Sequence, residues 1–122
     1  MTNVVAHAQS AANNTSTNWE RELLLQQIKT MERFDDKILN TVFSHYDSSL
    51  EAGLGLGWEW TISGALEKIE ECIKNGATLW RYEKQMFADY EARIPKPMIP
   101  LYRRTKAVVD AAPLDPEDTE KN

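Results

Sequence analysis

Apolar residues recur at three- and four-residue steps through residues 17–51, which is the spacing of one face of an α-helix. They are Leu24, Ile28, Met31, Ile38, Val42 and Tyr46, widened by Phe34, Leu39 and Phe43. Neither Gly nor Pro interrupts this stretch. Thr17 and Glu20 have the spacing of a capping box, in which each side chain bonds the backbone amide of the other, so we expect the helix to begin there.

An unbroken helix over this stretch would have roughly 34 residues and be about 50 Å long, at 1.5 Å per residue. A compact domain of about 100 residues has a radius of gyration of only about 13 Å, so the helix would extend beyond its own domain. Either it breaks near Asp35 and Asp36, or its far end packs on another chain. We favour the continuous helix, because the stretch contains no helix breaker.

Three shorter helical patterns follow, over residues 58–75, 78–93 and 101–111. Gly53 is placed to end the first helix in a left-handed conformation, and Asn75–Gly76 is a stop signal for the second. No stretch alternates apolar and polar residues between hairpin turns. The sequence therefore predicts an all-α fold, with one long N-terminal helix and two or three shorter helices packed along it.

Composition divides the 122-residue chain into a centre and two ends. Residues 1–17 contain no Asp, Glu, Lys or Arg, and we expect a flexible arm there. Residues 112–122 contain two prolines and four acids, which predicts an acidic disordered tail. Residues 18–111 remain as a single helical domain. The net charge of −5 argues against a protein that coats DNA generally.

Neither a secretory signal nor an apolar run of about 18 residues is present, so we expect a cytoplasmic protein that does not enter a membrane. Small size and polar ends are also typical of accessory proteins encoded by viruses or mobile elements.

No reactive constellation is visible in the sequence. The glycine run at Gly53, Gly55 and Gly57 lacks the Lys-Ser/Thr pair of a phosphate-binding loop. His45 has no acidic neighbour on its own helix face, and Cys72 falls on an apolar stripe beside acids, which indicates core packing. No Glu-x-x-His motif indicates a metal site. We therefore expect no catalytic, cofactor or metal-binding residue, and a closed polar pocket around His45 or Cys72 would be needed to favour an enzyme.

Aromatic residues are the first candidates for binding a partner, because Trp and Tyr bury a large area while keeping one polar group. The candidates are Trp58, Trp60, Trp80 and Tyr102. Trp58 and Trp60 cannot point the same way, so we expect one of them to be exposed. The alternative is that the tryptophans only complete a small core.

Residues 93–106 carry five positive charges and no acid, namely Arg93, Lys96, Arg103, Arg104 and Lys106. Such a stretch could bind phosphates of a nucleic acid, or it could be neutralised by the acidic tail that follows it. The sequence thus predicts a non-catalytic helical interaction protein, an adaptor, inhibitor or assembly factor, with a protein partner and a tendency to self-associate. The alternative is a small helical nucleic-acid-binding module that uses the basic stretch.

Overall fold

Five α-helices make up most of the computed structural model, which describes residues 12–54 and 57–118. They are α2 (Ala12–Thr30), α3 (Asp36–Glu51), α4 (Trp58–Lys74), α5 (Arg81–Asp89) and α6 (Ile99–Ala111). Two short 3₁₀ helices, η1 (Tyr90–Arg93) and η2 (Lys96–Met98), connect α5 to α6. The described residues contain no β-strand beyond one isolated bridge between Leu79 and Leu114. The expected all-α class is confirmed.

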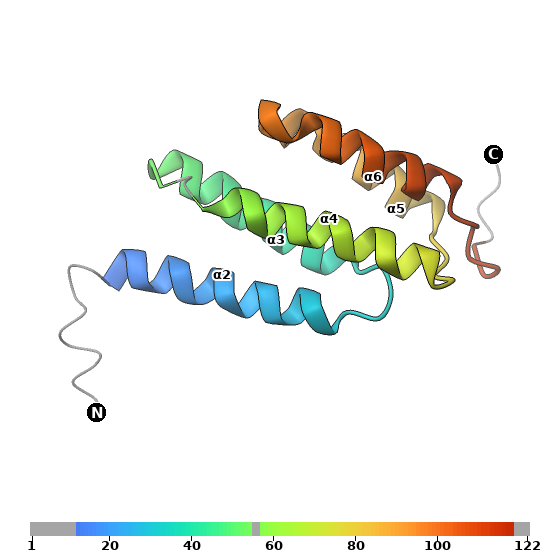
Figure 1. Cartoon of the computed structure of the whole chain (residues 1–122), viewed down its shortest axis with the longest axis horizontal. Coiled ribbons are helices and arrows are strands. Elements are labelled where there is room, and N and C mark those ends of the chain that lie inside the picture. Colours follow the sequence, from blue (N-terminus) through green and yellow to red (C-terminus); the bar gives the residue numbers. More distant parts are fainter. Residues whose placement is uncertain (1–11, 55–56, 119–122) are drawn as a thin grey trace.

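Helix α4 lies at the centre of the arrangement, with α2 and α3 on one side and α5 and α6 on the other (Figure 1). Its sequence supports this position, because Trp58, Ile62, Leu66 and Ile69 form a fully buried row along it. Thr61, Ala65 and Cys72 widen that row, so α4 is buried over much of its circumference. A helix packed on both sides needs such a broad apolar surface.

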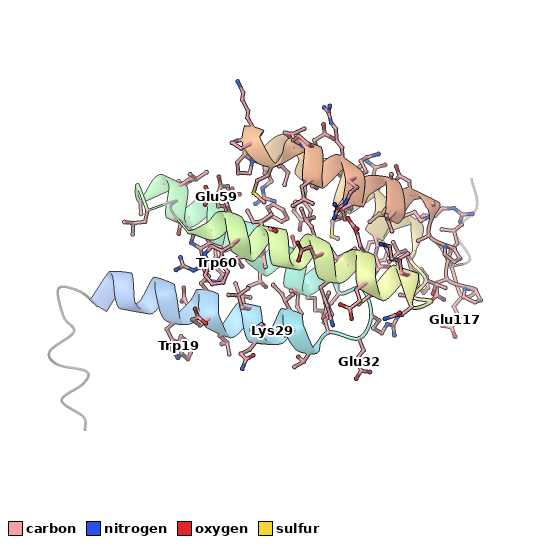
Figure 2. All side chains as sticks on the ribbon, in the orientation of Figure 1. Trp19, Lys29, Glu32, Glu59, Trp60 and Glu117 are labelled. Carbon is pink, nitrogen blue, oxygen red and sulfur yellow. The ribbon has the colours of Figure 1, made fainter. Side chains whose placement is uncertain are left out.

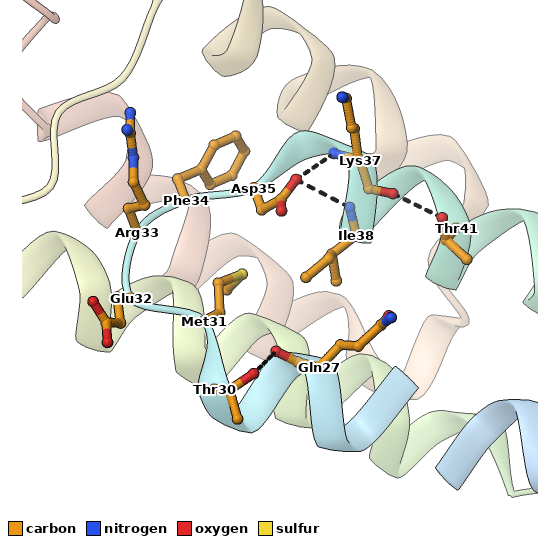
Figure 3. A pocket seen from close by; sticks show the side chains of 10 residues that line it. All are labelled: Gln27, Thr30, Met31, Glu32, Arg33, Phe34, Asp35, Lys37, Ile38 and Thr41. Carbon is orange, nitrogen blue, oxygen red and sulfur yellow. Dashed lines mark hydrogen bonds between the residues drawn. The ribbon is translucent and has the colours of Figure 1, made fainter. Parts of the chain in front are cut away.

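The expected long N-terminal helix is wrong, because the chain breaks between Thr30 and Asp36 and folds back on itself (Figure 3). Asp35 is the N-cap of α3, and its side chain accepts hydrogen bonds from the backbone N–H groups of Lys37 at 2.9 Å and Ile38 at 3.4 Å. An Asp cap can start a helix without Gly or Pro. Folding back also brings the apolar faces of both halves onto the same core, so no end of the helix is left for another chain to cover.

The predicted capping box is also wrong, because α2 begins at Ala12 and Thr17 lies inside the helix. Residues 12–17 therefore belong to α2 rather than to a flexible arm, while residues 1–11 of that arm lie outside the described residues. The other predicted helices agree more closely with the structure. Gly53 follows α3 with φ +77°, the left-handed conformation expected of it. Helix α5 begins three residues later than predicted and α6 two residues earlier.

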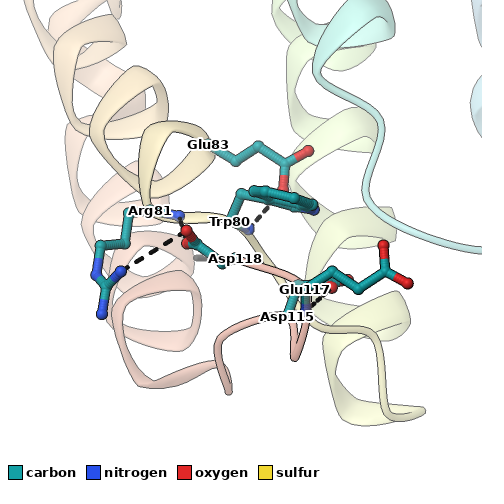
Figure 4. A network of polar contacts seen from close by, with 6 residues as sticks. All are labelled: Trp80, Arg81, Glu83, Asp115, Glu117 and Asp118. Carbon is teal, nitrogen blue, oxygen red and sulfur yellow. Dashed lines mark hydrogen bonds and ion pairs between the residues drawn. The ribbon is translucent and has the colours of Figure 1, made fainter. Parts of the chain in front are cut away.

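The acidic tail is likewise not free over residues 112–118, which we define as the C-terminal segment. Leu79 donates to the Pro113 carbonyl at 3.0 Å, and the Asp115 N–H donates to the Leu79 carbonyl at 2.8 Å. Beyond these bonds, the Asp118 carboxylate accepts from the Arg81 backbone N–H at 2.8 Å and contacts the Arg81 guanidinium (Figure 4). Asp118 thus binds the start of α5 and Asp115 accepts from Thr78, while no ion pair of the described residues joins this segment to residues 93–106.

Candidate interaction surface

The aromatic residues singled out from the sequence separate into buried and exposed ones. Trp58 and Tyr102 have no exposed surface and are part of the core, so neither side chain is presented to a partner at the surface. Trp80 is half-buried at the start of α5. Trp60 is 50% exposed, which confirms that the two neighbouring tryptophans of α4 point in different directions.

Trp58 is buried beneath two basic side chains from other helices. The His45 ring lies parallel to the Trp58 ring with 6.0 Å between centroids, and the Arg21 guanidinium lies 6.0 Å from the same ring. His45 Nδ1 is 3.3 Å from the Glu20 carboxylate of α2. A continuous helix over residues 17–51 would hold Glu20 about 37 Å from His45, at 1.5 Å per residue, and only the break between α2 and α3 brings the two together.

A small cavity adjoins this group and is lined by Glu20, His45, Ser48, Ser49 and Trp58, among others. Its volume of about 100 Å³ compares with about 300 Å³ or more for typical ligand pockets. A water molecule occupies about 30 Å³, so the space suits a few waters rather than a substrate. The Glu20–His45 pair therefore does not form the substrate-sized polar pocket that would favour an enzyme.

Four cations of the basic stretch pair with acids of the chain itself. Arg93 binds Asp47, Arg103 Nη2 lies 2.9 Å from Glu91, Arg104 Nε lies 3.2 Å from Glu70, and Lys106 Nζ lies 2.8 Å from Asp110. Lys96 is exposed and has no ion pair among the described residues. This pairing reduces the positive charge that a phosphate backbone would meet, and nothing in the arrangement favours the nucleic-acid alternative.

Cys72 is buried, as expected, with its sulfur 3.8 Å from the Met31 carbonyl oxygen. Burial raises the pKa of its thiol, Lys68 opposes this effect, and Glu71 adds to it. A thiol that is buried and protonated is a poor nucleophile. Cys72 is therefore a packing residue.

A hollow of about 700 Å³ lies at the connection between α2 and α3 (Figure 3). Three of its polar side chains bond local backbone. Asp35 caps α3, Thr30 donates to the Gln27 carbonyl at 3.1 Å, and Thr41 donates to the Lys37 carbonyl at 2.8 Å. These bonds shape the turn, and the polar or charged side chains of Gln27, Glu32, Arg33 and Lys37 complete the lining.

Exposed apolar side chains gather instead on α2 and the neighbouring part of α4. Trp19 is 63% exposed, Leu23 44% and Trp60 50% (Figure 2). Two shallow hollows share Leu25 and Lys29 and therefore form one continuous surface, which we call the α2–α4 face. The hollows are lined by Trp19, Glu22, Leu23, Leu25, Gln26 and Lys29 of α2, and by Gly64, Glu67, Lys68 and Glu71 of α4. Trp60 lies one helical turn before Gly64 on α4, and we count it as part of the same face.

Trp60 is held in place at one end of this face. The Arg21 guanidinium lies 5.5 Å from the Trp60 ring, within the range of a cation–π contact. Gly57 makes room for this arginine, because a Cβ at that position would lie 2.9 Å from Arg21 Nη1. The sequence analysis missed Trp19 and Leu23, although apolar residues outside the buried stripe of a helix are a usable signal for an exposed contact.

Comparison with known proteins finds no matching family model, no matching curated protein and no matching solved structure. Within residues 12–54 and 57–118, no helix combines the length and apolar character needed to cross a membrane. The same residues contain no group of three or more His, Cys, Asp or Glu side chains arranged to hold a metal ion.

Proposed function

We propose that the chain is a non-catalytic helical interaction protein, an adaptor, inhibitor or assembly factor, that binds a protein through the α2–α4 face. The observation that carries the proposal is the exposure of Trp19, Leu23 and Trp60 over adjoining helices. Contiguous apolar surface rimmed by polar residues marks contact sites in many proteins. Tryptophan is among the residues that contribute most to binding energy at such sites.

The surroundings of these side chains suit a binding surface. Glu22, Gln26 and Lys29 are exposed beside Trp19 and Leu23, and provide a polar rim. Trp60 rests against Arg21, which restricts its rotamers before a partner arrives and lowers the entropy cost of binding. Other exposed apolar residues, such as Leu50 on α3 and Tyr82 on α5, belong to other parts of the molecule.

Replacing Trp19 and Leu23 together by Ala tests the proposal. Both side chains project from the surface of α2 and neither belongs to the core, so the fold should not depend on them. A tagged chain is incubated with an extract of the source cells, to which an untagged copy of the chain has been added. Tyr82→Ala is the matched control, since Tyr82 is 55% exposed on α5. Far-UV circular dichroism checks that all variants keep their helices.

We expect the wild type and Tyr82→Ala to retain a bound protein that the W19A/L23A variant loses, with affinity reduced about tenfold or more. Identical capture by all three proteins, or no capture by the wild type, would contradict the proposal.

A further inference from the structure

Helix α2 presents two opposite charges that form no ion pair with residues 12–54 or 57–118. Glu22 and Lys29 are both exposed, and neither forms an ion pair among the described residues. They are two helical turns apart and thus about 10 Å from each other along the helix, beyond the reach of a direct contact. Leu23, Leu25 and Gln26 lie between them.

This pattern is self-complementary. In a two-fold symmetric contact, the same surface meets itself in the opposite direction. If two α2 helices lie antiparallel, with the axis between Leu25 and Gln26, then Glu22 of each copy faces Lys29 of the other. The same register brings Trp19 opposite the end of the second copy's α2, close to Lys29 and to Glu32 in the connection that follows (Figure 2).

We propose that the partner bound by the α2–α4 face is a second copy of this chain, in an antiparallel α2–α2 contact with reciprocal Glu22–Lys29 pairs. The inference rests on the proposed function and specifies its partner. Leu23 supplies the exposed apolar surface beside the axis, since Leu25 is only 8% exposed, and the Lys29 stem and ammonium group lie within reach of the second copy's Trp19 ring. A stable interface buries about 1,000 Å² or more, so the contact must extend beyond α2. The exposed Trp60 of α4 is the side chain we assign to that extension.

A charge-reversal experiment tests this register. Sedimentation equilibrium at low salt gives the dimer dissociation constant for the wild type, Glu22→Lys, Lys29→Glu and an equimolar mixture of the two variants. Each single variant places like charges opposite each other twice in its own dimer. In the mixed dimer, by contrast, both positions regain opposite charges. Glu117→Lys is the matched control, because Glu117 is exposed in the C-terminal segment, away from the α2–α4 face (Figure 2).

We expect each single variant to weaken the dimer about tenfold or more, and the mixture to return within about threefold of the wild type. Glu117→Lys should dimerise like the wild type. A mixture as weak as the separate variants, or a wild type that stays monomeric at high micromolar concentration, would overturn the inference. A monomeric wild type that still captures another protein in a Trp19- and Leu23-dependent way would leave the proposed function standing. Failure of both experiments would remove both proposals.

Discussion

The Thr105 hydroxyl of α6 donates a hydrogen bond of 2.6 Å to the Glu70 carboxylate of α4. Both residues are buried, with exposed fractions of 0% and 6%. Arg104, next to Thr105, adds two longer hydrogen bonds to the same carboxylate, at 3.2 Å and 3.4 Å. A buried carboxylate is tolerated when its oxygens are paired in this way, so this contact fixes α6 against α4 in one register.

The first prediction concerns the acid side of the stability curve. Burial tends to raise the pKa of Glu70, but the hydrogen bonds from Thr105 and Arg104 outweigh it, and the net pKa is lowered from 4.5. A carboxyl group with a lower pKa in the folded state stabilises the fold above its unfolded-state pKa, and this stabilisation is lost as the pH falls through the folded-state pKa. Urea unfolding between pH 7 and pH 2 should show this loss.

Glu70→Gln should reduce the free energy of unfolding at pH 7 by about 1–3 kcal/mol and flatten its decline in acid. Thr105→Val should move the decline to higher pH, because the folded-state pKa of Glu70 then lies closer to its ordinary value. Glu67→Gln, on an exposed position of the same helix, serves as the control. An unchanged pH dependence in Glu70→Gln would show that Glu70 does not contribute in the way described.

Two buried tyrosines each stack on a phenylalanine, and their hydroxyl groups meet different surroundings. Tyr90 stacks on Phe43 at 4.4 Å and donates to Asn40 Oδ1 at 2.5 Å. Tyr102 stacks on Phe87 at 4.7 Å, but its buried hydroxyl has no hydrogen-bond partner in the described part of the chain.

Tyr102→Phe should therefore leave the free energy of unfolding unchanged or raise it, while Tyr90→Phe should lower it by about 1 kcal/mol. Urea unfolding of the two variants at pH 7 measures both values. An equal loss in the two variants would mean that the hydroxyl groups are not distinguished by their hydrogen bonds.

Helical periodicity was sufficient to predict the class of the fold and most of the core. Ile62, Leu66 and Ile69 share one apolar stripe in the sequence and are fully buried. Periodicity could not show where the first stripe breaks, because Met31 and Phe34 continue it through a connection that is not helical. Met31 and Phe34 are buried because other parts of the chain cover them, which spacing along one helix cannot show. Asp35 is one of several acids in this stretch, and nothing in the sequence marks it as the residue that caps a new helix.

The candidate surface was harder to predict for a related reason. Spacing shows that Trp58 and Trp60 point apart, but the neighbouring helices decide which of them enters the core. Pairs such as Glu20–His45 and Arg93–Asp47 join different helices, so no pattern within one helix reveals them. The basic stretch looked unbalanced because its counter-charges lie outside it: Asp47 and Glu70 are distant in the sequence, and Glu91 and Asp110 lie just beyond its two ends.

The C-terminal segment should stabilise α5. Asp118 accepts from the Arg81 N–H at the start of this nine-residue helix, and its side chain is only 1% exposed. Asp118→Ala removes a negative charge from a helix N-terminus and should cost about 1 kcal/mol. Glu117→Ala, one residue away and exposed, should cost little. Thermal or urea unfolding compares the two, and equal stabilities would contradict a binding role for this segment.

Cross-linking at Gln26 tests most directly whether two α2 helices face each other. Gln26 is exposed and next to the inferred two-fold axis, while the native Cys72 is buried and should not react. A short bis-maleimide should join two copies of Gln26→Cys, and adding Glu22→Lys should suppress the product. Glu117→Cys provides the background of random collisions. A strong, Glu22-dependent dimer band at Gln26→Cys is the predicted result, and a band no stronger than that of Glu117→Cys would contradict the contact.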